Sequence, residues 1–148
     1  MRMRIIDATG HVVGRLASVV AKGLLNGEDI VVVHAEEAIV TGRRSTVLTT
    51  YRARRRRGST TSHMRGIGPF YPRRPDTILR RTISRMLPHE QARGREALRR
   101  LRVYLGLPEA YRGQPLEIIE VAKRAPQGPF LSLGEISRNL GSKFQVRP

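Results

Sequence analysis

The fold of this chain is set by residues 4–33, which read RIIDATGHVVGRLASVVAKGLLNGEDIVVV. Residues 3–6 predict a short strand. In residues 14–26 the apolar side chains recur at helical spacing, which predicts one buried face formed by Leu16, Val19, Val20 and Leu24. Residues 30–33 are an unbroken β-branched run, typical of a parallel strand that is covered on both faces. Strand, helix and strand in this order predict a βαβ unit with a right-handed crossover.

Beyond this unit the pattern predicts a third strand over residues 38–40 and a helix over 43–57, with Thr41 as its cap. A second helix runs from an Asp76 cap to residue 87, and its buried face holds Leu79, Ile83, Met86 and Leu87. A third covers residues 90–101 and exposes Arg93, Arg95, Arg99 and Arg100. A strand is expected at residues 102–105.

After Pro108 the chain is harder to interpret. Residues 116–121 fit either a strand or a helical turn, because their periodicity does not decide between the two. Pro126 and Pro129 enclose an expected loop. Ser132 and Glu135 have the spacing of a capping box, which predicts a short helix ending near residue 140. We expect a single domain over residues 1–148, with a βαβ start (1–42), a basic middle (43–102) and a last strand with a C-terminal extension (103–148).

The charge of the chain is concentrated in that middle part. The formal net charge is +16, of which residues 43–102 carry +15, whereas residues 1–42 carry −1 and residues 103–148 carry +2. Of the 28 basic residues, 25 are arginine. Arginine suits bidentate phosphate binding, although a G+C-rich genome gives the same bias toward arginine. Self-repulsion on this scale is relieved by a polyanionic partner such as a nucleic acid.

Residues 51–74, YRARRRRGSTTSHMRGIGPFYPRR, contain eight arginines and no acid. They indicate a loop that follows a phosphate backbone; a solvated basic linker is the alternative. Because the neighbouring predicted helices also carry arginine opposite their apolar faces, we predict RNA contacts by Arg52, Arg54, Arg55, Arg56, Arg57, His63, Arg65, Arg73, Arg74, Arg80, Arg81, Arg85, Arg93, Arg95 and Arg99. Tyr51, His63 and Tyr71 are candidates for base stacking, and Phe70 is expected to pin the loop to the domain.

Several other classes of function find no support. The absence of cysteine excludes disulfides, thiolate zinc sites and cysteine nucleophiles. The four histidines are widely spaced, so a metal site would need distant carboxylates; the adjacent Glu36 and Glu37 are expected to point in different directions. The loop from Gly10 to Gly14 lacks a Walker or dinucleotide motif and indicates a structural turn, although the helix that follows it could still hold an anion with Arg15. No charge-free run is long enough to span a membrane. We therefore expect no enzyme activity, no cofactor, no metal and no small-molecule substrate.

The sequence resembles the universal thirteenth protein of the large ribosomal subunit as a family. The likeness covers about residues 4–106. Its first part comprises Gly14-Arg15-Leu16-Ala17-Ser18, Ala21-Lys22, Leu25, Gly27, Val31-Val32-Val33, Ala35-Glu36 and Thr41-Gly42. Its most specific part is Met86-Leu87-Pro88, then Gly94-Arg95 after five residues and, after five more, Leu101-Arg102-Val103-Tyr104-Leu105-Gly106. Residues 131–136, LSLGEI, are similar to the archaeal and eukaryotic branch, and the chain length favours the archaeal type.

This resemblance implies a three-layer α/β/α fold; with the strands above we expect a small, mostly parallel sheet of four strands. It also implies a structural, non-enzymatic constituent of the large ribosomal subunit in the cytoplasm. The implied partners are 23S-type ribosomal RNA and neighbouring large-subunit proteins, with no membrane. The alternative is a freestanding RNA-binding translational regulator or RNA chaperone that uses the same basic surface.

Overall fold

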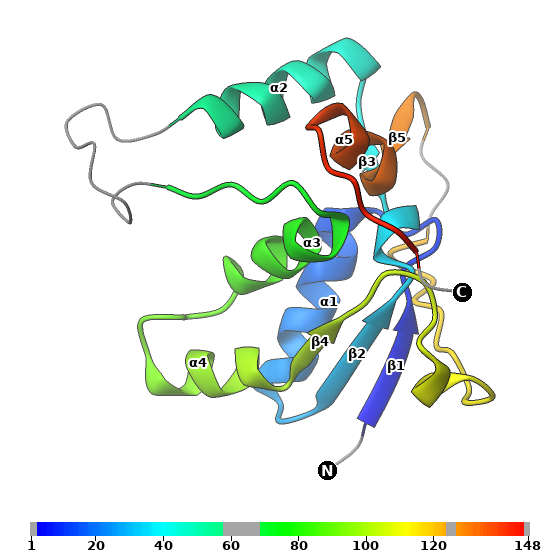
Figure 1. The fold of residues 1–148 in the computed structure, drawn as a ribbon. Coiled ribbons are helices and arrows are strands. Elements are labelled where there is room, and N and C mark those ends of the chain that lie inside the picture. The colour runs from blue at the N-terminus through cyan, green and yellow to red at the C-terminus, as the bar shows by residue number, and fades with distance from the viewer. Residues whose placement is uncertain (1–2, 58–68, 124–126, 147–148) are drawn as a thin grey trace.

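A three-stranded parallel sheet lies at the centre of the chain, in a computed structural model that describes residues 3–57, 69–123 and 127–146 (Figure 1). Its strands are β1 (Met3–Asp7), β2 (Asp29–Val33) and β4 (Leu101–Val103), in the order β1-β2-β4. Ile30 of β2 pairs with Arg4 on one side and Leu101 on the other. Helix α1 (Val13–Leu25) joins β1 to β2, so the predicted strand–helix–strand unit is confirmed.

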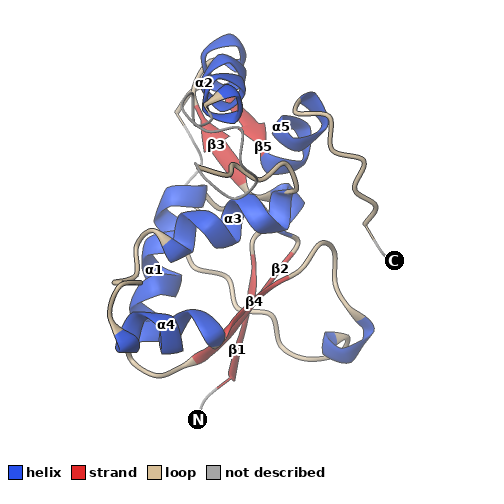
Figure 2. Ribbon diagram, turned by 60° about the vertical axis from the view of Figure 1, so that its left-hand side comes forward, coloured by secondary structure: helices blue, strands red, loops and turns tan. Residues whose placement is uncertain are grey.

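One face of this sheet is covered by helices. α1 buries Leu16, Val20 and Leu24 completely, as the periodicity predicts. Together with α3 (Pro75–Ser84) and α4 (Ala92–Arg99), it packs over the side chains of the sheet that point to this face (Figures 1 and 2). Those side chains come from all three strands and are Ile6, Ile30, Val32 and Leu101.

The other face of the sheet is covered by the chain that follows β4. Here Ile5, Val31 and Val33 pack against Tyr104, Leu107, Tyr111 and Leu116, a segment that includes the 3-10 helix η2 (Glu109–Tyr111). β2 is therefore buried on both sides, which explains its unbroken β-branched run. The three-layer α/β arrangement is confirmed, and its third layer consists of irregular chain and one 3-10 turn.

The predicted third strand exists but does not join the parallel sheet. β3 (Ile39–Thr41) instead pairs antiparallel with β5 (Phe130–Ser132), with Ile39 opposite Ser132. At the end of β2, His34 adopts the left-handed conformation (φ 53°) and begins the 3-10 helix η1 (Ala35–Glu37), which turns the chain away. The expected four-stranded sheet is thus a sheet of three strands beside a second of two, in the part of the chain that the structure describes.

Helix α2 (Arg44–Arg56) projects from the body of the molecule (Figure 1). Only Val47 and Leu48 are buried along it, and it contacts β5 and α5 (Leu133–Asn139). The ion pair between Arg44 and Glu135 also joins α2 to α5. The prediction of a helix over residues 43–57 is confirmed, but the sequence does not predict its attachment through the C-terminal extension.

The helix caps differ from the expectations in two of three cases. Thr41 does not cap α2 and Asp76 does not cap α3; the N-cap positions are Arg43 and Arg74, and neither makes a side-chain cap. Pro75 begins α3 instead, since proline is preorganised for the first helical position. The Ser132 hydroxyl does accept the Glu135 N–H at 3.2 Å, which confirms the cap of α5.

Several elements also differ in extent from the prediction. α3 ends at Ser84, so Met86 lies beyond the helix with 43% of its surface exposed, although Leu87 is buried. α4 is shorter than the expected 90–101, because Leu101 already belongs to β4. Residues 116–121 form no continuous strand: Glu117 makes an isolated bridge to Ile6, and a turn follows in which the Lys123 N–H donates to the Ile119 carbonyl oxygen.

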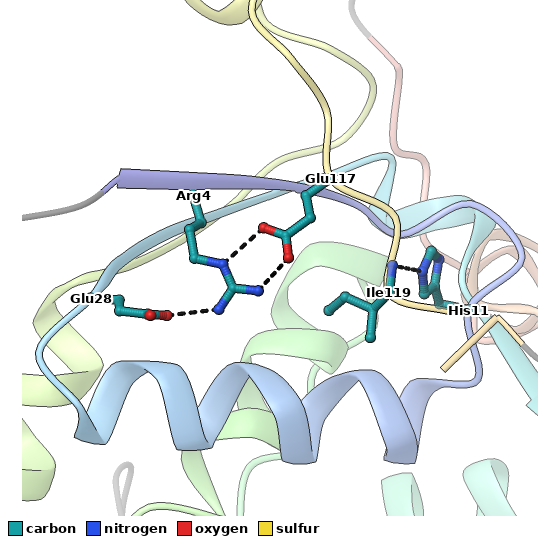
Figure 3. A network of polar contacts seen from close by, with 5 residues as sticks. All are labelled: Arg4, His11, Glu28, Glu117 and Ile119. Carbon is teal, nitrogen blue, oxygen red and sulfur yellow. Dashed lines mark hydrogen bonds and ion pairs between the residues drawn. The ribbon is translucent and has the colours of Figure 1, made fainter. Parts of the chain in front are cut away.

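Polar contacts fasten this segment to the sheet (Figure 3). The Arg4 guanidinium bonds the carboxylates of Glu117 (Nε to Oε2, 2.8 Å) and Glu28 (Nη1 to Oε2, 2.7 Å), which together raise the pKa of Arg4 above its ordinary value. The fully buried His11 accepts the Ile119 N–H at its Nε2, 3.0 Å away. Its Nδ1 must therefore carry the proton and donate to the Thr9 carbonyl oxygen at 3.0 Å, so His11 is a structural residue.

The close approach of α4 to the preceding loop gives a test of this packing. A Cβ at Gly94 would lie 2.1 Å from the Pro88 carbonyl oxygen, whereas a Cβ at Gly14 in α1 would meet nothing within 4 Å. We expect Gly94→Ala to lower the free energy of unfolding by about 1–3 kcal/mol, because backbone must move. Gly14→Ala, the matched control, should leave stability unchanged or raise it by up to about 1 kcal/mol.

Urea unfolding followed by circular dichroism measures both variants. Equal stability of the Gly94→Ala variant and the parent chain would contradict the packing described here.

Candidate nucleic-acid interface

Most of the predicted contact residues belong to three helices that lie on the same side of the molecule (Figures 1 and 2). α2, α3 and α4 are stacked there, and the projecting end of α2 carries the densest charge. The helix has no acidic residue, and Arg54, Arg55 and Arg56 occupy its last turn, where positive charge stabilises the negative end of the helix dipole. The sequence of α2 thus combines helix stability with an exposed cationic end.

Most of the predicted residues are exposed, and two lie outside the described residues. The exposed ones are Arg52, Arg54, Arg55, Arg56, Arg57, Arg73, Arg74, Arg80, Arg85, Arg93, Arg95 and Arg99. Arg81 is half-buried. His63 and Arg65 belong to residues 58–68, which the structure does not describe.

A cleft of about 450 Å³ separates the end of α2 from α3, and we call it the interhelix cleft. Among the described residues, five arginines and no acidic side chain line it: Arg54, Arg55 and Arg57 come from the α2 side and Arg81 and Arg85 from the α3 side. The remaining lining is mostly apolar or aromatic and consists of Tyr51, Tyr71, Pro72, Ile78, Thr82, Met86 and Leu140. The cleft therefore combines dense positive charge with uncharged, partly aromatic surface.

Two of these arginines hold the chain that precedes α3. The Arg81 guanidinium donates to the Phe70 carbonyl oxygen and lies over the Tyr71 ring, 4.7 Å from its centroid. Arg55 Nη1 donates to the Tyr71 carbonyl oxygen at 2.5 Å. The Ser137 hydroxyl donates to the Arg73 carbonyl oxygen. Residues 70–73 are thus fixed from α2, α3 and α5, and Arg81 is engaged within the fold.

The aromatic candidates differ in how firmly the fold holds them. Tyr51 is half-buried, with the Arg54 guanidinium 5.3 Å from its ring centroid; burial raises the pKa of Tyr51, and the Arg54 charge opposes that rise. Phe70, expected to pin the loop, has 66% of its surface exposed, and Arg81 bonds its main-chain carbonyl oxygen. Tyr71 is held both at its ring, by Arg81, and at its main chain, by Arg55.

Other arginines also have partners within the chain. Arg74 pairs with Asp76 at 3.1 Å, and Arg80 Nη1 donates to the Leu101 carbonyl oxygen at 3.3 Å. Arg95 donates to the Glu90 carbonyl oxygen at 3.4 Å. Arg100, expected to be exposed, is half-buried and donates to the Leu24 carbonyl oxygen at 3.4 Å, because its side chain folds back over α1.

The acidic residues near η1 come closer together than their sequence suggests. His34, Glu36 and Glu37 place one ligand atom each within 4.8 Å of one another, since the 3-10 turn brings adjacent side chains to one place. Glu36 accepts the Gly106 N–H at 3.1 Å, and Glu37 accepts the Thr9 hydroxyl at 3.0 Å. These hydrogen bonds join η1 to the segments that follow β4 and β1, which gives the cluster a structural role.

Backbone N–H groups of the loop between Gly10 and Gly14 donate to carbonyl oxygens of other segments of the chain. Gly10 has a positive φ of 68° and donates its N–H to the Glu37 carbonyl oxygen, while Val12 donates to that of Ala122. This favours the structural turn. Among the described residues no helix is both long and apolar enough to cross a membrane.

Comparison with known proteins shows which family the sequence is similar to. The family model described as ribosomal protein L13 matches residues 1–110. The large ribosomal subunit protein uL13 of Methanosarcina barkeri is 47% identical over 145 residues, which cover 96% of this chain and all of the relative. The uL13 proteins of Methanococcoides burtonii (44%; 96% of this chain, 100% of the relative) and Archaeoglobus fulgidus (46%; 93% and 86%) are similar over comparable lengths.

The position of Arg81 predicts a local effect of its removal. Arg81→Ala should raise the rate of chymotrypsin cleavage after Phe70 by about tenfold or more, because a charge-assisted hydrogen bond and a cation–π contact are lost from the segment. Arg85→Ala, one helical turn further on at an exposed position, is the control and should leave the rate unchanged. Equal cleavage of the two variants would show that Arg81 does not hold the segment.

Proposed function

This chain belongs to the ribosomal protein L13 family, and from this premise we propose that it binds large-subunit ribosomal RNA and supports assembly of the subunit and translation. The family and the names of the archaeal relatives make it a large-subunit ribosomal protein, with a ribosomal, cytoplasmic location. The family is one of structural components, which argues against an enzymatic role.

The observation that carries the proposal is the set of exposed arginines on α2, α3 and α4. Nearly the whole excess charge of the chain lies in the sequence region that forms these helices. Guanidinium groups bind phosphate through bidentate hydrogen bonds and release condensed counterions from RNA. The affinity for RNA therefore falls as the salt concentration rises. Contacts of this kind position a protein on the backbone and carry no base sequence by themselves.

The α2 end is the sharpest place to test this proposal. Replacing Arg54, Arg55, Arg56 and Arg57 by alanine removes four exposed charges and keeps residues that favour a helix. We expect weaker binding to a 23S-type ribosomal RNA transcript. If all four arginines bind phosphate, the slope of the logarithm of the binding constant against the logarithm of the salt concentration should become less negative by about 3. Filter binding at several salt concentrations measures affinity and slope together.

A matched control removes four charges elsewhere. Lys22, Arg112, Lys123 and Lys143 are exposed and lie outside the three helices, so their replacement by alanine should change affinity and slope much less. Thermal melting of both quadruple variants confirms that they fold. If the two variants lose binding equally, RNA binding does not depend on the α2 end.

The bound state in the cell separates the proposal from a freestanding RNA-binding regulator or RNA chaperone. Cell lysate is fractionated on sucrose gradients in high and low magnesium, and this chain is quantified by mass spectrometry. We expect it in the large-subunit peak, equimolar with other subunit proteins and resistant to moderate salt. A chain that stays at the top of the gradient would favour the freestanding protein.

A further inference from the structure

We propose that the interhelix cleft receives one unpaired nucleotide of the bound RNA, an inference that rests on the proposed RNA-binding function and names what this site takes. RNA-binding proteins read single-stranded loops and bulges by stacking extruded bases on aromatic rings or guanidinium planes. The cleft between α2 and α3 offers both kinds of surface, in Tyr71 and the arginines around it.

The size of the cleft fits a single nucleotide. Its volume of about 450 Å³ lies within the range of about 300–1,000 Å³ that holds small ligands. A paired helix is far wider than such a cleft, so only a nucleotide that has left the stack can enter. The surrounding exposed arginines of α2 and α3 would then follow the backbone on either side of the extruded residue.

The distribution of charge orients the nucleotide. Arg54 and Arg57 on the α2 side and Arg85 on the α3 side are exposed at the cleft, whose described lining holds no acidic side chain. Their guanidinium groups bind the phosphate and leave the base to face the uncharged lining. Met86, which is 43% exposed, supplies a polarisable apolar contact there.

The wall that meets the base is fixed before RNA arrives. Tyr71 is held by Arg55 at its carbonyl oxygen and by the Arg81 guanidinium against its ring, so the side chain and the main chain are both restrained. Such preorganisation lowers the entropy cost of binding. An acidic peptide would use the arginines but would leave Tyr71 and Met86 without a flat partner, which favours the nucleotide.

The test uses two RNA hairpins of equal length, one with a single bulged 2-aminopurine and one with the same base paired. We expect the parent chain to bind the bulged hairpin roughly tenfold more tightly, the effect of one stacked base, with a saturable change in 2-aminopurine fluorescence. Tyr71→Leu and Met86→Glu should each abolish that preference.

Two controls match these variants. Phe70→Leu also removes an aromatic ring from the same segment, but Phe70 does not line the cleft. Val121→Glu adds the same charge at an exposed apolar residue outside it. Both should keep the preference for the bulged hairpin.

Three results would overturn the inference. Equal affinity of the parent chain for both hairpins, with salt-dependent binding, would refute the nucleotide site and leave the proposed function intact. Failure to bind either hairpin or the ribosomal RNA transcript would refute both. Binding of a poly-glutamate peptide that Met86→Glu abolishes, without any preference between the hairpins, would assign the cleft to an acidic protein segment instead.

Discussion

The structure depends on the burial of β2 on both faces. Its residues Ile30 and Val32 face the helices, and Val31 and Val33 face the chain that follows β4. A strand of this kind requires two covering layers, and each layer then determines the course of a different part of the chain. The helical layer brings α3 and α4 to one side of the molecule. The other layer returns the chain past β1 toward β5 and α5.

The elements that the sequence predicts well are those whose signal is local. The apolar spacing in α1 and the β-branched run of β2 each lie within one element, so periodicity alone identifies them. The pairing of β3 with β5 is a contact between residues 39–41 and 130–132, and nothing in either three-residue strand specifies its partner. Pro129 indicates a loop in the sequence but directly precedes β5 in the structure. A proline at the start of a strand is tolerated because its missing N–H is not needed for pairing with the neighbouring strand.

The candidate site likewise contains features that the sequence predicts and features that it does not. Exposure of the arginines follows from the helical period, and the sequence therefore identifies most of them correctly as surface residues. Their internal partners do not follow from it, because a long flexible guanidinium side chain can reach a carbonyl far away in the sequence. Arg100 reaches Leu24 and Arg80 reaches Leu101 in this manner. The interhelix cleft also escapes sequence reasoning, since its lining joins α2, α3 and Leu140.

Some arginines of this chain make contacts within the fold and others are exposed to solvent, and the share of each kind differs between helices. Arg81 and Arg100 make contacts within the fold, whereas the end of α2 carries a dense group of exposed arginines on a helix with only two buried residues. A helix with so little apolar burial gains little from the core to offset the repulsion among its own charges. Bound phosphate would supply the missing counter-charge at that end. We therefore expect the stability of the projecting, arginine-rich α2 to be coupled to the proposed RNA partner, while the sheet and its two covering layers are held by burial within the chain itself.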